Sequence, residues 1–187
     1  NGNMDIHVKY GNLNAGNFTA NAMIEAKYGN IEVGNLQDAQ LDLGYVGTAK
    51  IRNAKDLTID SKYSNLDIQD IQSLRMEIKY GNLTIESVSR LDMEIKYSDA
   101  KIGTLKDALN VSSLSYSNLK IRNLSHSFSK VNVESHYGNL EVALPAKTSF
   151  RIVAENMKYS SCDVNGFNIT RKHFDDEDRD KNYTYEI

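Results

Sequence analysis

Lys79-Tyr80-Gly81-Asn82-Leu83-Thr84-Ile85 is one copy of a short segment that recurs along the chain. Its core is a tyrosine followed by glycine or serine, then in most copies asparagine, then leucine or isoleucine. Successive tyrosines of the series are 17 to 22 residues apart. A near-constant period of this length is typical of stacked-repeat proteins, in which each unit buries its apolar face only against its neighbours. The tyrosines of the series are Tyr10, Tyr28, Tyr45, Tyr63, Tyr80, Tyr97, Tyr116, Tyr137 and Tyr159.

Apolar and polar residues alternate in the segment before each tyrosine. The apolar ones stand two, four and six positions before it, as Ile78, Met76 and Leu74 do before Tyr80. A period of two indicates a β-strand with one buried face. The tyrosine falls in the same phase, so we expect its ring to point inward. The i, i+3, i+4, i+7 spacing of an amphipathic helix does not occur in the repeats.

The alternation restarts after each tyrosine, which indicates a corner in the chain. The next apolar residues stand three, five and eight positions after it, as Leu83, Ile85 and Val88 do after Tyr80. Each repeat should therefore form a long strand, a tight corner, a short strand and a second bend. The sequence predicts an all-β, single-domain parallel β-helix (β-solenoid) of about nine to ten rungs, right-handed by the usual twist preference.

The residues at the corner suit close stacking of the rungs. Glycine and serine interchange after the tyrosine, so this position requires a small residue and no left-handed backbone. At a rung spacing of ~4.8 Å, asparagine amides can bond from one rung to the next, and tyrosine rings can stack favourably. A binding stripe for sugars or surfaces is the alternative interpretation. The inward phase of the tyrosines favours a structural role.

Some repeats depart from the pattern. The third contains Gly44-Tyr45-Val46-Gly47-Thr48, and its apolar pair, Ala49 and Ile51, comes one residue late. Residues 111–114 indicate a bulge, and residues 141–156 indicate a longer loop.

The end of the chain loses the repeat. Residues 171–181 are mostly charged and are predicted to form a loop or part of a cap, whereas residues 182–187 alternate again and are predicted to form a last strand. No linker divides the chain. The sequence therefore predicts one solenoid domain over residues 1–187, with repeats over about 4–168 and a charged loop or cap over 169–187.

The composition is that of an ordinary folded protein, with 187 residues, 40% hydrophobic content and a formal net charge of −3. Cys162 is the only cysteine, which excludes an intramolecular disulfide. No stretch approaches the ~18 apolar residues that span a bilayer as a helix. The chain begins at Asn1 in mid-pattern, which is compatible with a leader segment that has been cleaved or omitted.

Two outward columns of the repeat carry opposite charges. Lysine precedes many of the tyrosines, and an acidic residue stands three positions before them, as Lys79 and Glu77 do in the repeat of Tyr80. A column of like charges costs energy, which a flanking column of opposite sign offsets. We interpret the two columns as a solvated face that resists aggregation. A docking strip for anions or glycans is the alternative.

The sequence carries no catalytic, cofactor-binding or metal-binding signature, and it assigns no binding residues. The histidines His7, His126, His136 and His173 form no paired ligand motif, and a single cysteine makes a zinc site unexpected. The acidic run 175–180 lacks the alternating ligands of a calcium loop, so we expect a solvated loop there. The negative net charge and the lack of a basic patch argue against nucleic acid as a partner.

The recurring corner resembles that of a family of uncharacterised bacterial domains labelled as adhesins. The resemblance rests on residues 79–85 and on segments such as His136-Tyr137-Gly138-Asn139-Leu140-Glu141-Val142, and it covers roughly residues 4–168. It implies repeated β-solenoid rungs and an exported location, in the periplasm, in the outer membrane or at the cell surface. It carries over no functional residues, because the family has no defined site and its label rests largely on architecture.

From these features we expect a non-catalytic, adhesin-like β-solenoid of the cell envelope that binds or presents to a glycan or to another envelope protein. The first alternative is a polysaccharide-active enzyme, a lyase or a glycoside hydrolase, whose site would need paired carboxylates, or calcium with a basic residue, facing one groove. The second alternative is a structural or envelope-stress component. The sequence determines neither the ligand nor the oligomeric state.

Overall fold

The chain forms two compact units, Asn1–Leu144 and Pro145–Ile187, each with its own β-sheet. No described residue lies in a helix. That all 187 residues form one domain stays a prediction. In the computed structural model the described residues are 3–146, 149–154, 171–177 and 180–186.

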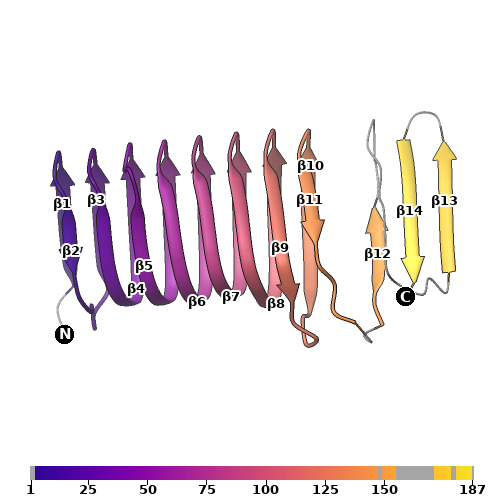
Figure 1. The fold of residues 1–187 in the computed structure, drawn as a ribbon, viewed down its shortest axis with the longest axis horizontal. Coiled ribbons are helices and arrows are strands. Elements are labelled where there is room, and N and C mark those ends of the chain that lie inside the picture. Colours follow the sequence, from indigo (N-terminus) through magenta and orange to yellow (C-terminus); the bar gives the residue numbers. More distant parts are fainter. Residues whose placement is uncertain (1–2, 147–148, 155–170, 178–179, 187) are drawn as a thin grey trace. The chain divides into compact units, whose positions relative to one another are not determined.

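The first unit is a solenoid of about eight turns, in which the chain winds around a common axis and neighbouring coils pair as parallel strands (Figure 1). The parallel β-helix is thus confirmed, with fewer than the nine to ten rungs predicted. Tyr159, the ninth tyrosine of the series, lies outside the described residues. The strands of this unit are β1 (Met4–Lys9), β2 (Leu13–Ala15), β3 (Ala22–Lys27), β4 (Ile31–Gly44), β5 (Ala49–Lys62), β6 (Asn65–Lys79), β7 (Asn82–Lys96), β8 (Asp99–Ser115), β9 (Asn118–Leu124), β10 (Lys130–His136) and β11 (Asn139–Val142).

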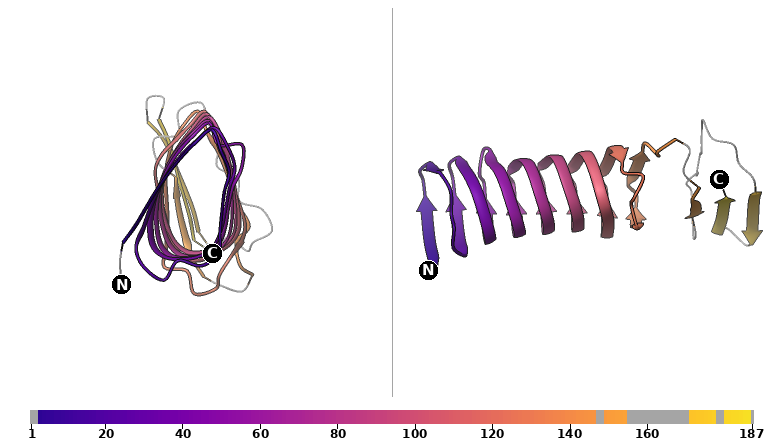
Figure 2. Two further views of the ribbon diagram at one scale, coloured as in Figure 1. Left: turned by 90° about the vertical axis from the view of Figure 1, so that its left-hand side faces the viewer. Right: turned by 90° about the horizontal axis from the view of Figure 1, so that it is seen from below.

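Each long strand runs from one tyrosine corner to the next and passes the second bend without interruption. The register places equivalent residues of successive repeats opposite each other, as with Ile68 and Ile85 or Met76 and Met93 in the pairing of β6 with β7. Viewed along the axis, the coils superpose as a narrow ring with one pointed end (Figure 2, left). The stacked register that the sequence predicts is therefore confirmed.

The interior of the ring holds the predicted apolar columns. Leu74, Met76 and Ile78 before Tyr80 are all buried, and so are Leu83, Ile85 and Val88 after it. Removing an aliphatic side chain of this size from water contributes about 1.5–3 kcal/mol. Because every coil repeats the same columns, the core is one continuous cluster along the axis.

The predicted irregularities also occur. Ala49 lies opposite Ile31 and Leu66 in spite of its late position, because the additional residue Val46 is accommodated at the corner and is buried. In β8 the register shifts so that Ser112 is left without a partner in β7, which confirms the bulge at residues 111–114. A second shift, near Lys106, was not predicted.

The second unit is an antiparallel sheet with the order β12-β14-β13. Its strands are β12 (Arg151–Ala154), β13 (Arg171–Glu177) and β14 (Asp180–Glu186). The last strand is confirmed, but the loop predicted at 171–181 is wrong, because most of that segment pairs with β14. Val153, which the pattern assigned to an inward column of the solenoid, lies opposite Thr184 in this sheet. Residues 155–168, the rest of the predicted repeat region, lie outside the described residues.

Ser61 is the polar exception in an inward column, where its register neighbours are Leu43 and Ile78. Its side chain is fully buried and its hydroxyl has no hydrogen-bond partner. Ser61→Val should raise the free energy of unfolding by about 1–2 kcal/mol, because an unsatisfied buried hydroxyl is replaced by a larger apolar side chain at a position where the neighbouring coils hold Leu43 and Ile78. Urea denaturation measures this change.

The matched control is Thr84→Val, which makes a similar exchange on the exposed face of β7. We expect it to change the free energy of unfolding by less than about 0.5 kcal/mol. A loss of stability in Ser61→Val would mean that the hydroxyl contributes an interaction that outweighs its burial.

Candidate functional site

Each coil of the solenoid turns at a tyrosine whose backbone is left-handed. The φ angles of these residues lie between 50° and 59°. This conformation costs an L-residue other than glycine roughly 1–2 kcal/mol, and a bulky side chain adopts it rarely. These tyrosines are also the only non-glycine residues of the described chain with positive φ. They are Tyr10, Tyr28, Tyr45, Tyr63, Tyr80, Tyr97, Tyr116 and Tyr137.

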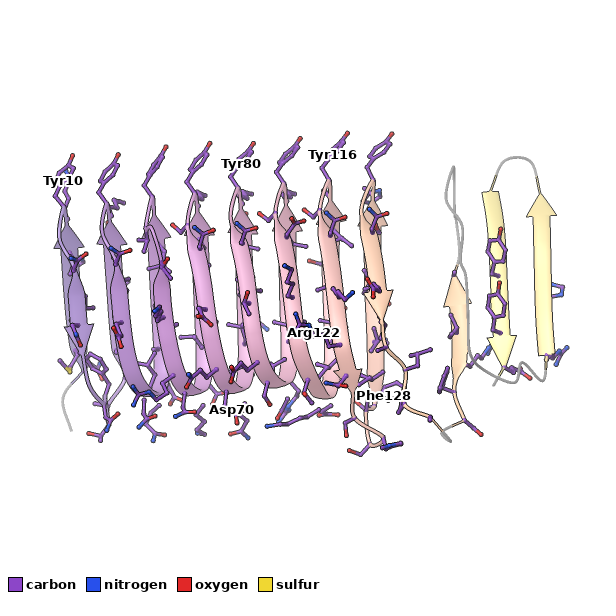
Figure 3. All side chains as sticks on the ribbon, viewed as in Figure 1. Tyr10, Asp70, Tyr80, Tyr116, Arg122 and Phe128 are labelled. Atoms are coloured by element: carbon purple, nitrogen blue, oxygen red, sulfur yellow. The ribbon has the colours of Figure 1, made fainter. Side chains whose placement is uncertain are left out.

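The left-handed backbone directs the rings outward. Figure 3 shows Tyr10, Tyr80 and Tyr116 projecting from one edge of the solenoid into solvent. The inward orientation predicted for the tyrosines is therefore wrong, because the two-residue alternation does not continue through a residue with positive φ. The structural interpretation of this corner depended on the inward phase and loses that support.

The rings of the eight tyrosines form a continuous stack, the tyrosine ladder. Successive ring centroids are 4.8 to 5.2 Å apart, with interplanar angles of 1° to 12°. The predicted stacking is confirmed, but it lies on the exterior. The inner six tyrosines are 45–55% exposed, whereas Tyr10 is 72% and Tyr137 is 82% exposed. Because inner rings cover each other's faces, the ladder presents ring edges and hydroxyls to solvent.

The small residue after the tyrosine permits the close approach of neighbouring coils. A Cβ atom on Gly81 would lie 2.0 Å from the carbonyl oxygen of Ser64 in the preceding coil. Where serine takes this place, its hydroxyl serves the backbone: Ser98 Oγ donates to the Lys96 carbonyl at 2.8 Å and accepts from Gly81 N–H at 3.1 Å. The prediction of a small residue without a left-handed backbone is confirmed for Gly81.

The asparagines that follow form the predicted amide ladder. Asn82 Nδ2 donates to Asn65 Oδ1 at 2.9 Å, and Asn118 Nδ2 donates to Asp99 Oδ1 at 2.7 Å. The asparagine series is broken in the third coil, where Thr48 replaces asparagine and its N–H donates to Asn30 Oδ1.

A second amide ladder lies at the other bend and was not predicted. Asn35 Nδ2 donates to Asn17 Oδ1 at 2.8 Å, and Asn53 Nδ2 donates to Asn35 Oδ1 at 2.6 Å. The sequence does carry a signal for this ladder. In the first three repeats an asparagine stands directly before the buried residue of the second bend, as in Asn17-Phe18, Asn35-Leu36 and Asn53-Ala54.

A shallow groove with a volume of about 530 Å³ lies between the tyrosine and asparagine rows. We call it the tyrosine groove. It is open to solvent along its length, unlike the enclosing pockets that bury most of a small molecule. It spans four coils, and it is lined by Tyr63, Asn65, Tyr80, Gly81, Asn82, Tyr97, Ser98, Asp99 and Tyr116.

A second hollow, of about 580 Å³, lies on the coils near the N-terminus. Asp38 and Asp56 are among its lining residues, and Lys55 contacts both, at 4.0 and 3.7 Å. The single positive charge of Lys55 offsets part of the negative charge of the two carboxylates, and all three side chains are exposed, as on a solvated face.

The predicted columns of opposite charge form ion pairs along the strands. Lys79 Nζ pairs with Glu77 Oε1, Lys27 Nζ with Glu25 Oε1 at 2.8 Å, and the same arrangement recurs in other coils. The hydrogen bond from Lys79 holds the pKa of Glu77 below its ordinary value, and the same bond raises the pKa of Lys79. These charges are thus engaged with one another and belong to the solvated face.

The histidines and acidic residues do not assemble a metal site in the described part of the chain. His7 pairs with Asp5 at 3.1 Å and with Glu25 at 3.0 Å, and His136 pairs with Glu134 at 3.3 Å. No group of three histidine, cysteine, aspartate or glutamate side chains among the described residues could hold a metal ion. Cys162 lies outside the described residues.

Comparisons with known proteins do not assign the chain to a family. No protein-family model, no curated protein and no solved structure matches it. Among the described residues, no helix is long and apolar enough to cross a membrane. The exposed corner is therefore the feature of this chain that bears on its function.

Substitutions at Tyr80 test whether the left-handed backbone limits the corner. Tyr80→Gly should change the free energy of unfolding by less than about 1 kcal/mol, because relief of strain offsets the loss of two stacking contacts. Tyr80→Val should lower it by about 2 kcal/mol or more, because a β-branched residue at positive φ loses the stacking and keeps the strain. Urea denaturation of both variants measures these changes in the free energy of unfolding. Equal losses would contradict the assigned role of the backbone.

The ion pair of Glu77 makes stability depend on pH. Since the pKa of Glu77 is lowered in the fold, its contribution is present above the ordinary value of 4.5 and is lost as the pH falls below it. When the pH is lowered from neutral to about 3, the free energy of unfolding of the native chain should fall by up to ~1 kcal/mol more than that of the Glu77→Gln variant. Urea denaturation at the two pH values measures the difference. The control is Asp67→Asn, which removes an exposed carboxylate without an ion pair to a described residue. Its free energy of unfolding should fall between the two pH values by as much as that of the native chain.

Proposed function

We propose that the chain is a non-catalytic, adhesin-like β-solenoid of the bacterial cell envelope that binds a glycan or an envelope protein along the tyrosine ladder. The observation that carries the proposal is the exposed tyrosine in the left-handed conformation in eight successive coils. Glycine or asparagine takes this conformation at less cost. Strained residues that recur at one place in a fold are found where function requires them.

The energetics of the ladder support contact with a partner. Each stacked pair contributes about 0.5–1.5 kcal/mol, and each left-handed tyrosine costs roughly 1–2 kcal/mol. The two effects are similar in size, so the stability of the solenoid alone gives little reason to prefer tyrosine over glycine. A partner that contacts the ring edges and hydroxyls supplies that reason.

The charges favour binding over catalysis. Four of the carboxylates on the outward face of the strands before the tyrosines, Glu25, Asp60, Glu77 and Glu94, are paired with the lysine two residues further on. The tyrosine groove contains one ionisable carboxylate, Asp99, and this residue accepts a hydrogen bond from Asn118. The exported location rests on the resemblance of the corner to the adhesin-labelled family.

Replacing three central tyrosines tests the proposal. In the variant Tyr63→Asn, Tyr80→Asn, Tyr97→Asn the fold should persist, because asparagine tolerates the left-handed backbone. Binding to whole bacterial cells and to a glycan array should fall at least about tenfold, which is ~1.4 kcal/mol of lost contact. Flow cytometry and array fluorescence measure binding, and circular dichroism verifies the fold.

The matched control changes three exposed residues of the same coils, as Asp67→Asn, Thr84→Val, Lys101→Gln. Its binding should equal that of the native chain. If the native chain binds neither cells nor glycans, or if both triple variants bind as it does, the proposal is wrong.

A further inference from the structure

We infer that the tyrosine groove binds a single chain of neutral, β-1,4-linked pyranose units, laid along the solenoid axis with one sugar per coil. This inference rests on the proposed function and names the ligand of the same site. Four independent features of the groove carry it: its repeat distance, the chemical groups it presents, its charge and its width.

The repeat distance of the groove fits a polysaccharide. Ring centroids along Tyr63, Tyr80, Tyr97 and Tyr116 are 4.9 to 5.2 Å apart, and the rings are nearly parallel, with interplanar angles of 1° to 6°. An extended β-1,4-linked chain advances by about this distance with each sugar, so each coil meets one sugar. Successive sugars are turned by about half a turn, so equivalent hydroxyls meet every second coil. An extended polypeptide places same-side residues about 6.6–6.8 Å apart and loses register within a few coils.

The groups along the groove suit hydroxylated ligands. Ring faces of the inner tyrosines are covered, so sugars cannot stack on them, but the ring edges carry partial positive charge and attract oxygen atoms. The phenol hydroxyls of the four tyrosines bond to no other described residue. Asn82 uses one amide hydrogen within its ladder and keeps the other for a ligand. The coils of Tyr63 and Tyr80 thus each offer a hydroxyl, a polarised edge and an amide, and the coil of Tyr97 offers the Asp99 carboxylate in place of the amide.

The charge of the groove selects a neutral polymer. Asp99 is the only charged residue among those that line the groove, and there is no lysine or arginine. Polyuronides and nucleic acids carry one negative charge for each unit and would need a row of cations to bind. Neutral sugars need none.

The width and length of the groove favour one short stretch of a single chain. The ladder is one ring wide and stands at an edge of the solenoid, so it offers a line of contact and no flat face for a crystalline surface (Figure 3). The groove begins after the third coil, where Thr48 replaces asparagine and Val46 adds a residue to the corner. Four tyrosines line it, which sets the bound stretch at about four sugars.

Calorimetry with oligosaccharides of increasing length tests the inference. The probes are β-1,4-linked oligomers of glucose, of mannose and of N-acetylglucosamine, from one to eight units, titrated into the full chain. In at least one series the affinity should rise about tenfold or more from the dimer to the tetramer and then level off. An oligogalacturonide of the same length, which carries a charge on each unit, should bind at least about tenfold more weakly.

Two asparagine variants separate the groove from the fold. Asn82→Leu removes an amide from the groove, and Asn35→Leu removes an equivalent amide from the ladder at the second bend. Asn82→Leu breaks one amide-to-amide bond and Asn35→Leu breaks two, so Asn35→Leu should lower the free energy of unfolding at least as much as Asn82→Leu does. We expect Asn82→Leu to lower the tetramer affinity at least about fivefold, the equivalent of ~1 kcal/mol, and Asn35→Leu to leave it unchanged.

The outcomes distinguish the two proposals. If no oligomer binds while the native chain still binds cells through its tyrosines, the inference is wrong and the proposed function stands. Equal affinity for monomer and tetramer, equal effects of the two asparagine variants, or tight binding of the oligogalacturonide also overturns the inference. If neither cells nor oligomers bind, both proposals fail.

Discussion

Backbone hydrogen bonds between successive coils place each residue directly above its equivalent in the preceding repeat, and the rest of the structure depends on this constraint. Any property of one position is multiplied along the axis. Apolar residues become a continuous core, as with Ile68 and Ile85, and amides become ladders, as with Asn65 and Asn82. An unfavourable feature is multiplied as well, which is why the charged columns pair with columns of opposite sign.

Most of the fold could be predicted from the sequence, because a strand with one buried face has apolar residues at every second position, and this alternation can be recognised in the sequence alone. The inward columns, the bulge at Ser112 and the amide ladder all followed from position in the repeat. The antiparallel strand β13 could not be predicted in the same way. Its residues are mostly charged, and it forms because its backbone pairs with β14, whose Tyr183, Thr184 and Tyr185 favour a strand.

The candidate site could be predicted only in part. The sequence identified the residues of the corner, but a period of two cannot show that one residue in the series has a positive φ. In the sequence Tyr80 falls in the phase of Ile78, although the odd step from Tyr80 to Leu83 indicates that the alternation breaks there. The groove was not predicted for the same reason, since it exists only because the tyrosine rings stand outside the core.

The side-chain amides of the ladders all point the same way. Asn35 donates to Asn17, Asn82 to Asn65 and Asn139 to Asn118, in each case from the later coil to the earlier one. Dipoles aligned in this manner add along the axis and polarise one another. The exterior of the solenoid therefore has an electrical direction as well as a period, and a polymer with chemically different ends would rest on it more favourably in one orientation than in the reverse.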